Sequence, residues 1–336
     1  MPPPARTDQD EGRVRGVIPT AGELVAVTCP AGSISRLMRE CADGTLGLED
    51  EDHTMRVEIE ETRRPFDTQG WTHLSRGAWS SGGRVVILDV CTSGFDLLVD
   101  VSGRVPGFTY RHRPPTRTRA LSLALPSRAR LLARAALLQY PAMWLAGTRG
   151  RAPLHASAVK AGRVTALVAG ASGVGKSTLI GREAEAGGTA TGDNVSIVDG
   201  TAVWGVVEPT RGESGFGRVM PHGRREGHLA NRVARLDPDR VVILRRSTEE
   251  HVAPCDADVV TRVLVGSTYI AGELRRFWSF SALLALGTGI GPAHPPVAEV
   301  AAAFAERLPR VSIALPSVDG VRLCDLLSGS EVQSWT

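Results

Sequence analysis

The sequence lacks long apolar runs and paired cysteines, and it has very little lysine. None of its 336 residues belongs to an apolar run of roughly 18 residues, so we expect no membrane-spanning helix. The N-terminal stretch has no apolar h-region, so we expect no secretory signal. The five cysteines are scattered without a C-x-x-C motif, which argues against a disulfide scaffold and a zinc site. These absences favour a protein of the reduced cytoplasm.

The net charge of +3 is small, so we expect neither a nucleic acid nor a membrane surface as partner. The charge is unevenly distributed along the chain. Residues 1–100 hold ten arginines and 17 acidic residues, whereas residues 101–150 hold nine arginines and no acidic residue. A basic block beside an acidic one is either a site for an acidic partner or an internal charge match. The sequence leaves both interpretations open.

At about 150 residues per domain, the length predicts two domains. Residues 1–20 are polar and proline-rich, and we interpret them as a disordered lead-in. Residues 21–150 predict a small, β-rich and mostly antiparallel N-terminal domain. It ends in a linker helix within residues 126–147, which Pro141 should kink or end. The β-type runs lie at 24–29, 55–60, 84–90, 95–101 and 120–125.

Residues 151–336 are predicted to form the second domain, and its first feature is a hairpin. Residues 152–159 and 163–170 read as two strands that flank the turn Lys160-Ala-Gly162. The second strand leads directly into G-A-S-G-V-G-K-S at 170–177, which matches G-x-x-x-x-G-K-[ST] between a strand and a helix. The sequence therefore predicts a phosphate-binding loop. Its cofactor-binding residues would be Gly170, Ala171, Ser172, Gly173, Val174, Gly175, Lys176, Ser177 and Thr178.

Each part of this loop has a chemical reason. Glycines let backbone N–H groups close around a triphosphate, and the following helix presents its positive end to the same anion. Lys176 should reach the β- and γ-phosphates of ATP, and Ser177 should be a ligand of Mg²⁺. Only Lys160 and Lys176 are lysine among 39 basic residues, and a slim ammonium fits inside such a loop where a planar guanidinium does not.

The sequence downstream of the loop differs from that of a typical ATPase or GTPase. The helix is predicted to end at Gly187-Gly188. The best later apolar strand, 240–247, ends in Arg245-Arg246, where such proteins place a Mg²⁺-binding carboxylate. The nearest suitable carboxylate is Asp193.

Three segments, in order and spacing, resemble the HPr kinase/phosphorylase-like family, whose fold is similar to that of phosphoenolpyruvate carboxykinase. LHASAV (154–159) resembles the family's histidine-containing strand, GASGVGKST (170–178) its phosphate loop, and TGDNVSIV (191–198) its acidic segment. The resemblance implies an α/β domain with a mixed sheet and a P-loop of the HPr kinase/phosphoenolpyruvate carboxykinase type. It also implies ATP and Mg²⁺ as cofactors.

The chain departs from the family pattern in two places. Gly192-Asp193-Asn194 supplies one carboxylate where the family usually has two adjacent acids. The Arg-Gly-Leu-Gly-Ile type of run found in the bifunctional HPr enzymes is missing, since residues 206–218 read VVEPTRGESGFGR. We therefore expect a divergent member with another acceptor. Kinases that tailor peptide natural products belong to this family.

The resemblance and the residue types suggest roles, each with an alternative. Asp193 is a candidate general base or Mg²⁺ ligand, and otherwise a turn residue. His155 matches the strand histidine as a catalytic residue, and otherwise is a core histidine. Glu208 could complete the metal site with Ser177 and Asp193, and otherwise is a loop acid. Asn194 could supplement the metal shell or form an Asx turn.

The long segment 209–235 is rich in glycine and arginine and is typical of a lid or binding loop. Arg211 and Arg218 are the best candidates there to stabilise charge on a transferred phosphoryl group. Further on, residues 273–287 and 296–308 predict helices, and residues 311–315 predict a strand.

The leading hypothesis is a kinase that transfers the γ-phosphoryl group of ATP to a hydroxyl, either of a peptide or protein Ser/Thr or of a small hydroxylated metabolite. The alternative is a nucleotide-binding regulatory protein without transfer activity, which the missing second acid favours. Decarboxylase chemistry is less consistent with the sequence, which lacks a His/Lys/Asp metal set. A homo-oligomer is left open.

Overall fold

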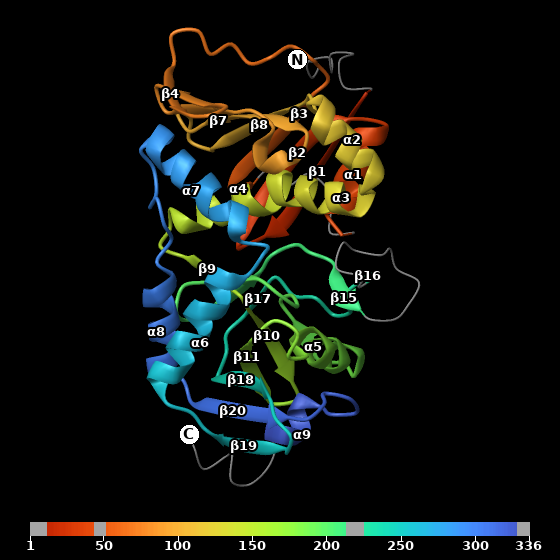
Figure 1. Cartoon of the computed structure of the whole chain (residues 1–336), viewed down its shortest axis with the longest axis vertical. Coiled ribbons are helices and arrows are strands. Elements are labelled where there is room, and N and C mark those ends of the chain that lie inside the picture. The colour runs from red at the N-terminus through yellow and green to blue at the C-terminus, as the bar shows by residue number, and fades with distance from the viewer. Residues whose placement is uncertain (1–11, 44–51, 213–224, 328–336) are drawn as a thin grey trace, which may run out of the picture. The chain divides into compact units, whose positions relative to one another are not determined.

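A computed structural model describes residues 12–43, 52–212 and 225–327, which form two compact units (Figure 1). The first unit comprises residues 1–18 and 24–138, and the second comprises 19–23 and 139–336, as far as these are described. Both units contain helices and sheets, so the protein is a mixed α/β protein with parallel and antiparallel pairing.

The division lies before the predicted boundary at residue 150, within the predicted linker helix. Tyr140 belongs to the second unit because its ring packs against Phe277 and Phe280, and its hydroxyl donates to the carbonyl of Glu273 at 2.6 Å. Residues 19–23 join the same unit through backbone bonds, among them Ala21 N–H to the carbonyl of Gly205 at 2.7 Å. The helical segment thus ends one unit and begins the next.

The first unit is built on an eight-stranded sheet in the order β1-β2-β3-β8-β7-β6-β5-β4. The pairs β2–β3 and β3–β8 are parallel, and the pairs from β4 through β8 are antiparallel. Alternation explains the buried face: Met55, Val57 and Ile59 of β3 are buried, while the residues between them are not. The strands are β1 (Arg13–Thr20), β2 (Glu23–Pro30), β3 (Met55–Glu60), β4 (Thr72–Ser75), β5 (Ala78–Ser81), β6 (Arg84–Ile87), β7 (Phe95–Asp100) and β8 (Gly107–His112).

Two sequence predictions for this unit are wrong. Residues 13–20 of the supposed disordered lead-in form β1, because Val17 and Ile18 are buried in the sheet, whereas residues 1–11 lie outside the described part. The run 120–125, predicted as a strand, is helical. Its alternating leucines stay exposed, so the alternation there did not mark a buried strand face.

Helices accompany this sheet and lead into the second unit. They are α1 (Ser33–Cys41), α2 (Thr116–Ala124) and α3 (Pro126–Arg134), and α3 contacts both of the others. A π-helical turn, Ala135–Gln139, follows and is continued by α4 (Tyr140–Gly147). Pro141 follows directly after this π-helical turn, where the regular i→i−4 hydrogen bonds are already interrupted, so the helix does not end at the proline.

The second unit has three layers around a six-stranded mixed sheet in the order β12-β10-β11-β18-β20-β19. Leu167 and Ala169 of β11 pack towards α6 and α8, whereas Ala166 and Val168 pack towards α5 and α9 (Figure 1). Both faces of the central strands are thus buried, as near-continuous apolar runs predict. The elements are β10 (Ala156–Ala161), β11 (Val164–Gly170), β12 (Thr189–Ala190), β18 (Arg240–Arg246), β19 (His251–Pro254), β20 (Arg310–Leu315), α5 (Lys176–Glu185), α6 (Ala257–Ile270), α8 (Val297–Arg307) and α9 (Leu323–Leu327).

The predicted strand 152–159 is divided at His155. Its first part, β9 (Ala152–Leu154), pairs with β13 in a four-stranded sheet, and its second part, β10, pairs with β11 in the six-stranded sheet. The predicted hairpin exists, with a tighter turn, since β10 and β11 pair as far as Ala161 and Val164. The other elements are β13 (Ser196–Val198), β14 (Val203–Gly205), β15 (Thr210–Gly212), β16 (Arg225–Gly227), β17 (Arg235–Leu236) and α7 (Arg275–Thr288).

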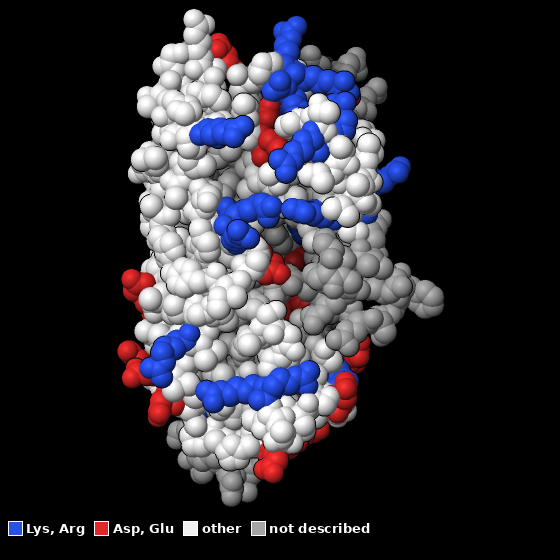
Figure 2. Space-filling model, in the orientation of Figure 1, with Lys and Arg blue, Asp and Glu red and all other residues white. Residues whose placement is uncertain are grey.

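Within the described ranges, no helix combines the length and the apolarity that a membrane crossing requires. On the face drawn in Figure 2, the Lys and Arg side chains lie in several separate groups, with Asp and Glu side chains beside some of them.

Candidate functional site

The glycine-rich segment 170–177 connects the end of β11 to the start of α5, as the sequence predicts. Gly170 needs to be glycine because a Cβ there would lie 2.4 Å from the carbonyl oxygen of Leu244 on β18. Gly175 has a φ of 106°, and a Cβ there would lie 2.6 Å from Cγ1 of Val318. The segment is therefore shaped by close backbone approach and by left-handed conformation, which only glycine adopts freely.

Lys176 lies inside this turn. Its ammonium donates to the carbonyls of Gly170 and Ala171 at 2.9 and 3.1 Å, and the residue is only 6% exposed. Lys176 is also the first residue of α5, so its positive charge adds to that of the helix N-terminus. The result is a concentration of positive potential at the mouth of the loop.

Two cavities adjoin the loop. The smaller, of about 110 Å³, is lined by Gly175, Lys176, Ser177 and Thr178. The larger, of about 970 Å³, lies against Gly170 through Val174. The residues that line both cavities are His155, Ser172, Gly173, Asn194 and Arg246. The two cavities therefore lie next to each other.

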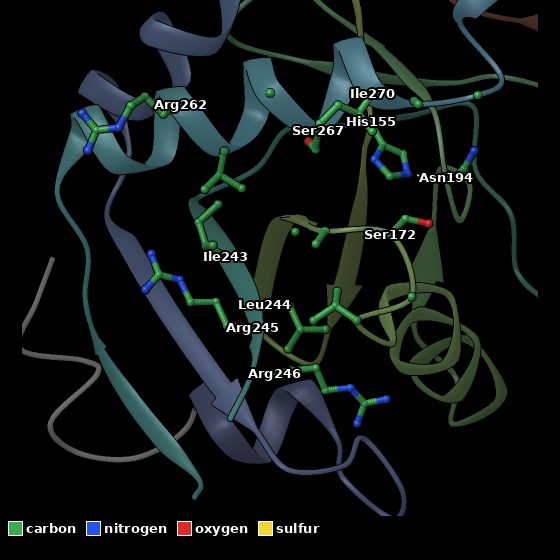
Figure 3. A pocket seen from close by; sticks show the side chains of 18 of the residues that line it. His155, Ser172, Asn194, Ile243, Leu244, Arg245, Arg246, Arg262, Ser267 and Ile270 are labelled. Carbon is green, nitrogen blue, oxygen red and sulfur yellow. Dashed lines mark hydrogen bonds between the residues drawn. The ribbon is translucent and has the colours of Figure 1, made fainter. Parts of the chain in front are cut away.

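Three arginines line the larger cavity: Arg245 and Arg246 at the end of β18, and Arg262 on α6 (Figure 3). β18 runs parallel to β11 and is its neighbour, so the ends of both strands meet at the same edge of the sheet. In the sequence alone, Arg245 and Arg246 argue only against a strand that ends in a carboxylate. Their place beside the loop depends on a pairing of strands far apart in the sequence, which no local signal announces.

His155 and Asn194 are brought together at the wall between the two cavities. The Nε2 atom of His155 lies 2.9 Å from Oδ1 of Asn194, and Figure 3 shows the two side chains next to each other. The backbone N–H of His155 donates to Oγ1 of Thr268 on α6 at 2.9 Å. Each of the two residues is 5% exposed. This pair is a fixed polar group at the position that both cavities share.

Asp193 and Glu208 lie behind this wall, and neither lines either cavity. Asp193 is 1% exposed and Glu208 is 5% exposed. Oε1 of Glu208 accepts the backbone N–H of Val195 at 3.1 Å, and the hydroxyl of Ser157 donates to the carbonyl of Gly192. Buried polar groups therefore hold the turn 192–195 in place from both sides.

A segment that the sequence analysis missed closes the small cavity from the other side. Ser317, Val318 and Asp319 follow β20 and line that cavity. Arg182 of α5 donates to the carbonyl of Val318 and pairs with the carboxylate of Asp319 at 3.1 Å. The hydroxyl of Ser317, and after it Arg182, lowers the pKa of Asp319. Asp319 is thus an anion on the rim beside Ser177.

The remaining candidates come from segment 209–235. Arg211 lies in β15, but its side chain, like the whole of Arg218, lies outside the described residues. Arg232 donates to the carbonyl of Glu208. Among the residues that the structure describes, no group of three or more His, Cys, Asp and Glu side chains is arranged to hold a metal ion.

Comparison with protein-family models and with curated proteins finds no match for this chain.

Proposed function

We propose that the chain is an ATP-dependent phosphotransferase, which moves the γ-phosphoryl group to a hydroxyl of a peptide or protein Ser/Thr or of a small hydroxylated metabolite. The observation that carries this proposal is the ammonium of Lys176 inside a glycine turn at the N-terminus of α5, with Ser177 on the adjoining cavity. Backbone N–H groups, a helix N-terminus and one lysine together are suited to a polyphosphate.

We also propose that the second unit is a P-loop domain of the HPr kinase/phosphoenolpyruvate carboxykinase type. The three segments that carry the resemblance are separate in the sequence, yet a residue of each lines both cavities: His155, Ser172 and Asn194. A mixed sheet with β10 antiparallel and β18 parallel to β11 is consistent with this type. Convergence of the three segments is what a shared site requires.

In this proposal Lys176 exchanges partners when the triphosphate binds. Its ammonium now satisfies two loop carbonyls, and phosphate oxygens would compete for the same donor. Arg246 lines both cavities and would meet negative charge that develops on the transferred group. Transfer would then depend on electrostatic positioning rather than on covalent chemistry by the protein.

Mg²⁺ fits the donors of the small cavity in part. A nucleotide-bound Mg²⁺ takes most of its ligands from phosphates and water and few from the protein, and the Ser177 hydroxyl suits this role. When bound, the ion would neutralise phosphate charge. Glu208 contacts the backbone of the turn and does not line the cavity, so its metal role stays a prediction.

Two residues are candidates for the base that takes the acceptor proton. Asp193 is suggested by the family resemblance, but it is 1% exposed and lies behind the cavity wall. His155 lines both cavities and is oriented by Asn194. A base must come within hydrogen-bond reach of the hydroxyl, so the geometry favours His155 as the nearer group.

The larger cavity suits the acceptor. It is as large as common small-molecule sites, and its wall combines Ile243 and Val263 with three arginines and one acidic residue, Glu273. Such a wall favours an occupant that carries negative charge as well as apolar groups. An acidic peptide segment or an anionic metabolite would meet that requirement.

The alternative function is nucleotide-dependent regulation without transfer. The burial of Asp193 away from both cavities favours it, because an inaccessible carboxylate cannot act on an acceptor.

Incubation of the full chain with γ-³²P-labelled ATP, Mg²⁺ and cell extract tests the proposal. We expect a labelled acceptor with the parent chain and none with Lys176→Ala. Lys160→Ala is the matched control, since Lys160 is the only other lysine and lies exposed on β10. A chain that is stabilised by MgATP but labels nothing supports the regulatory alternative. A chain that neither binds nor transfers contradicts both.

A further inference from the structure

A further cavity, of about 750 Å³, is lined by residues of the first unit alone. It is formed by residues that follow β3 and β6, by β7, by the end of β8 with the residues after it, and by one side of α2. Its volume is in the range of sites for small organic molecules. The charged and titratable residues that line it are Arg63, Asp89, Asp96, His112, Arg113 and Arg119.

The carboxylates of Asp89 and Asp96, which line this cavity, both accept hydrogen bonds from protein donors. Asp96 is 3% exposed, pairs with the guanidinium of Arg113 and accepts the backbone N–H of Asp89 at 3.0 Å. The two carboxylate oxygens of Asp89 accept the N–H of Gly94 and the hydroxyl of Thr118, each at 2.8 Å. Neither carboxylate therefore needs a further cation.

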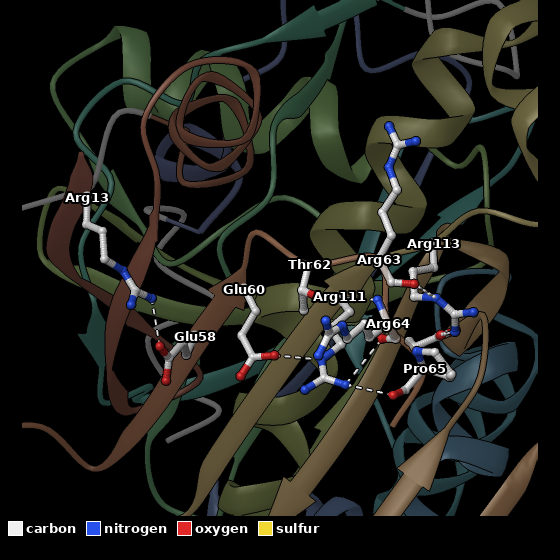
Figure 4. A network of polar contacts seen from close by, with 10 residues as sticks. Arg13, Glu58, Glu60, Thr62, Arg63, Arg64, Pro65, Arg111 and Arg113 are labelled. Carbon is white, nitrogen blue, oxygen red and sulfur yellow. Dashed lines mark hydrogen bonds and ion pairs between the residues drawn. The ribbon is translucent and has the colours of Figure 1, made fainter. Parts of the chain in front are cut away.

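Two of the three arginines have no acidic partner among the described residues. Arg113 forms an ion pair with Asp96, and its Nε also donates to the carbonyl of Arg63 at 2.7 Å. Figure 4 shows the Arg63 side chain extending away from this network. Arg119 is exposed on α2 and, like Arg63, has no ion pair in the described part of the chain. Three arginines against two carboxylates leave the cavity with excess positive charge.

His112 lies within the field of two of these arginines. Burial is the main cause that lowers its pKa, and repulsion by Arg119 and Arg63 lowers it further. The ring of Phe95 lies 4.9 Å from the His112 ring, so one side of the imidazole faces an aromatic group. The other charged groups lining the cavity are Asp89 and the Asp96–Arg113 pair, whose charges are held by the contacts described above.

The loop that carries Asp89 has unusual backbone geometry. Asp89, Cys91 and Thr92 have φ values of 43°, 56° and 60°, the left-handed region that non-glycine residues rarely adopt. Such conformations are costly and cluster at functional sites. Leu88, which is 39% exposed, precedes this loop and lines the cavity, as does Leu123, which is 81% exposed.

We propose that this cavity binds a small organic anion, whose phosphate or carboxylate group is held by Arg63, Arg119 and His112 and whose apolar part lies on Leu88 and Leu123. Guanidinium groups without acidic partners are suited to oxyanions. The exposed leucines supply the apolar contact that an inorganic ion would not use. The site lies in the other unit from the glycine-rich loop, so the proposal stands whether or not the chain is a kinase.

The test uses the full chain and two probes, benzoate and phenyl phosphate, with benzyl alcohol as the neutral control. The imidazole resonance of His112, assigned with His112→Gln, reports binding by NMR. We expect a saturable shift with at least one anion and none with benzyl alcohol. The probe that binds more tightly shows whether the cavity prefers a carboxylate or a phosphate group. Benzoate keeps its charge between pH 6 and 8, so tighter binding at lower pH would reflect protonation of His112 beside the anion.

Arg119→Gln should weaken the binding by about tenfold or more, as expected when a charged hydrogen bond is lost. Arg117→Gln is the matched control, since Arg117 is exposed on the same helix and does not line the cavity. Lys176→Ala should leave the binding unchanged. A His112 resonance that neither probe moves overturns the proposal. So does an equal effect of the two arginine variants, a loss of binding in Lys176→Ala, or binding of an acidic peptide alone.

Discussion

At the scale of single residues, Lys176 is the residue that tests the proposed nucleotide site. MgATP at 100 times its dissociation constant stabilises a folded protein by about 2.7 kcal/mol, which is readily seen as a higher melting temperature. We expect Lys176→Ala to abolish this shift, because the ammonium lies inside the loop, and Lys160→Ala to keep it. Equal shifts in the two variants would contradict the phosphate-loop assignment.

The candidate bases can be separated by a pair of variants. If His155 takes the acceptor proton, His155→Gln should lower the transfer rate by about 10²-fold and change its pH profile, with ATP affinity nearly unchanged. If Asp193 is the base, Asp193→Asn should show that loss instead. Steady-state kinetics over a range of pH distinguish them. A parallel loss of rate and ATP affinity would indicate a metal or structural role.

Individual site residues were predictable only where the site is continuous in sequence. Residues 170–177 could be recognised because strand, glycines, lysine and helix follow one another along the chain. Arg246 and Arg262 could not, because they reach the site through the pairing of β18 with β11 and the packing of α6. His155 and Asn194 were candidates, but their contact across 39 positions depends on tertiary structure.

At the scale of elements, the conformation of the loop between β11 and α5 can be tested with two glycines. Gly175→Ala should destabilise the chain by about 1–3 kcal/mol, because alanine at a φ of 106° is strained, and its Cβ would also overlap Val318. Gly181→Ala, within α5 and with no atom near its Cβ, should instead stabilise by about 0.5–1 kcal/mol. Denaturant unfolding measures both. A tolerated Gly175→Ala would show that the loop has another conformation.

The elements that were predicted correctly are those whose apolar pattern agrees with their environment. β3, β7, β20, α7 and α8 all have the predicted type. The prediction of a strand at 120–125 is wrong because its leucines alternate without being buried. The run instead continues the helix that begins after Pro115. The parallel pairing of β2, β3 and β8 was not foreseen, since nothing local specifies the partner of a strand.

At the scale of the whole molecule, the structure bears on the two interpretations of the basic block 101–150. Arg111 pairs with Glu60 at 2.6 Å and packs over the ring of Phe66, while Arg113 pairs with buried Asp96 (Figure 4). These arginines match the acidic first hundred residues internally. Four other exposed arginines of the block have no such pair among the described residues, so they remain available to a partner: Arg104, Arg117, Arg119 and Arg128.

This difference between Arg113 and Arg117 predicts that their substitutions change the stability of the chain by different amounts. Arg113→Gln leaves Asp96 without its guanidinium and should destabilise the chain by about 2–3 kcal/mol, whereas Arg117→Gln should change stability by less than about 0.5 kcal/mol. Each unit has its own core, and the loop belongs to the second, so Arg113→Gln should keep the nucleotide-induced shift that Lys176→Ala loses. Calorimetric melts with and without MgATP measure both effects. Loss of the nucleotide shift in Arg113→Gln would show that the first unit is required to form the nucleotide site.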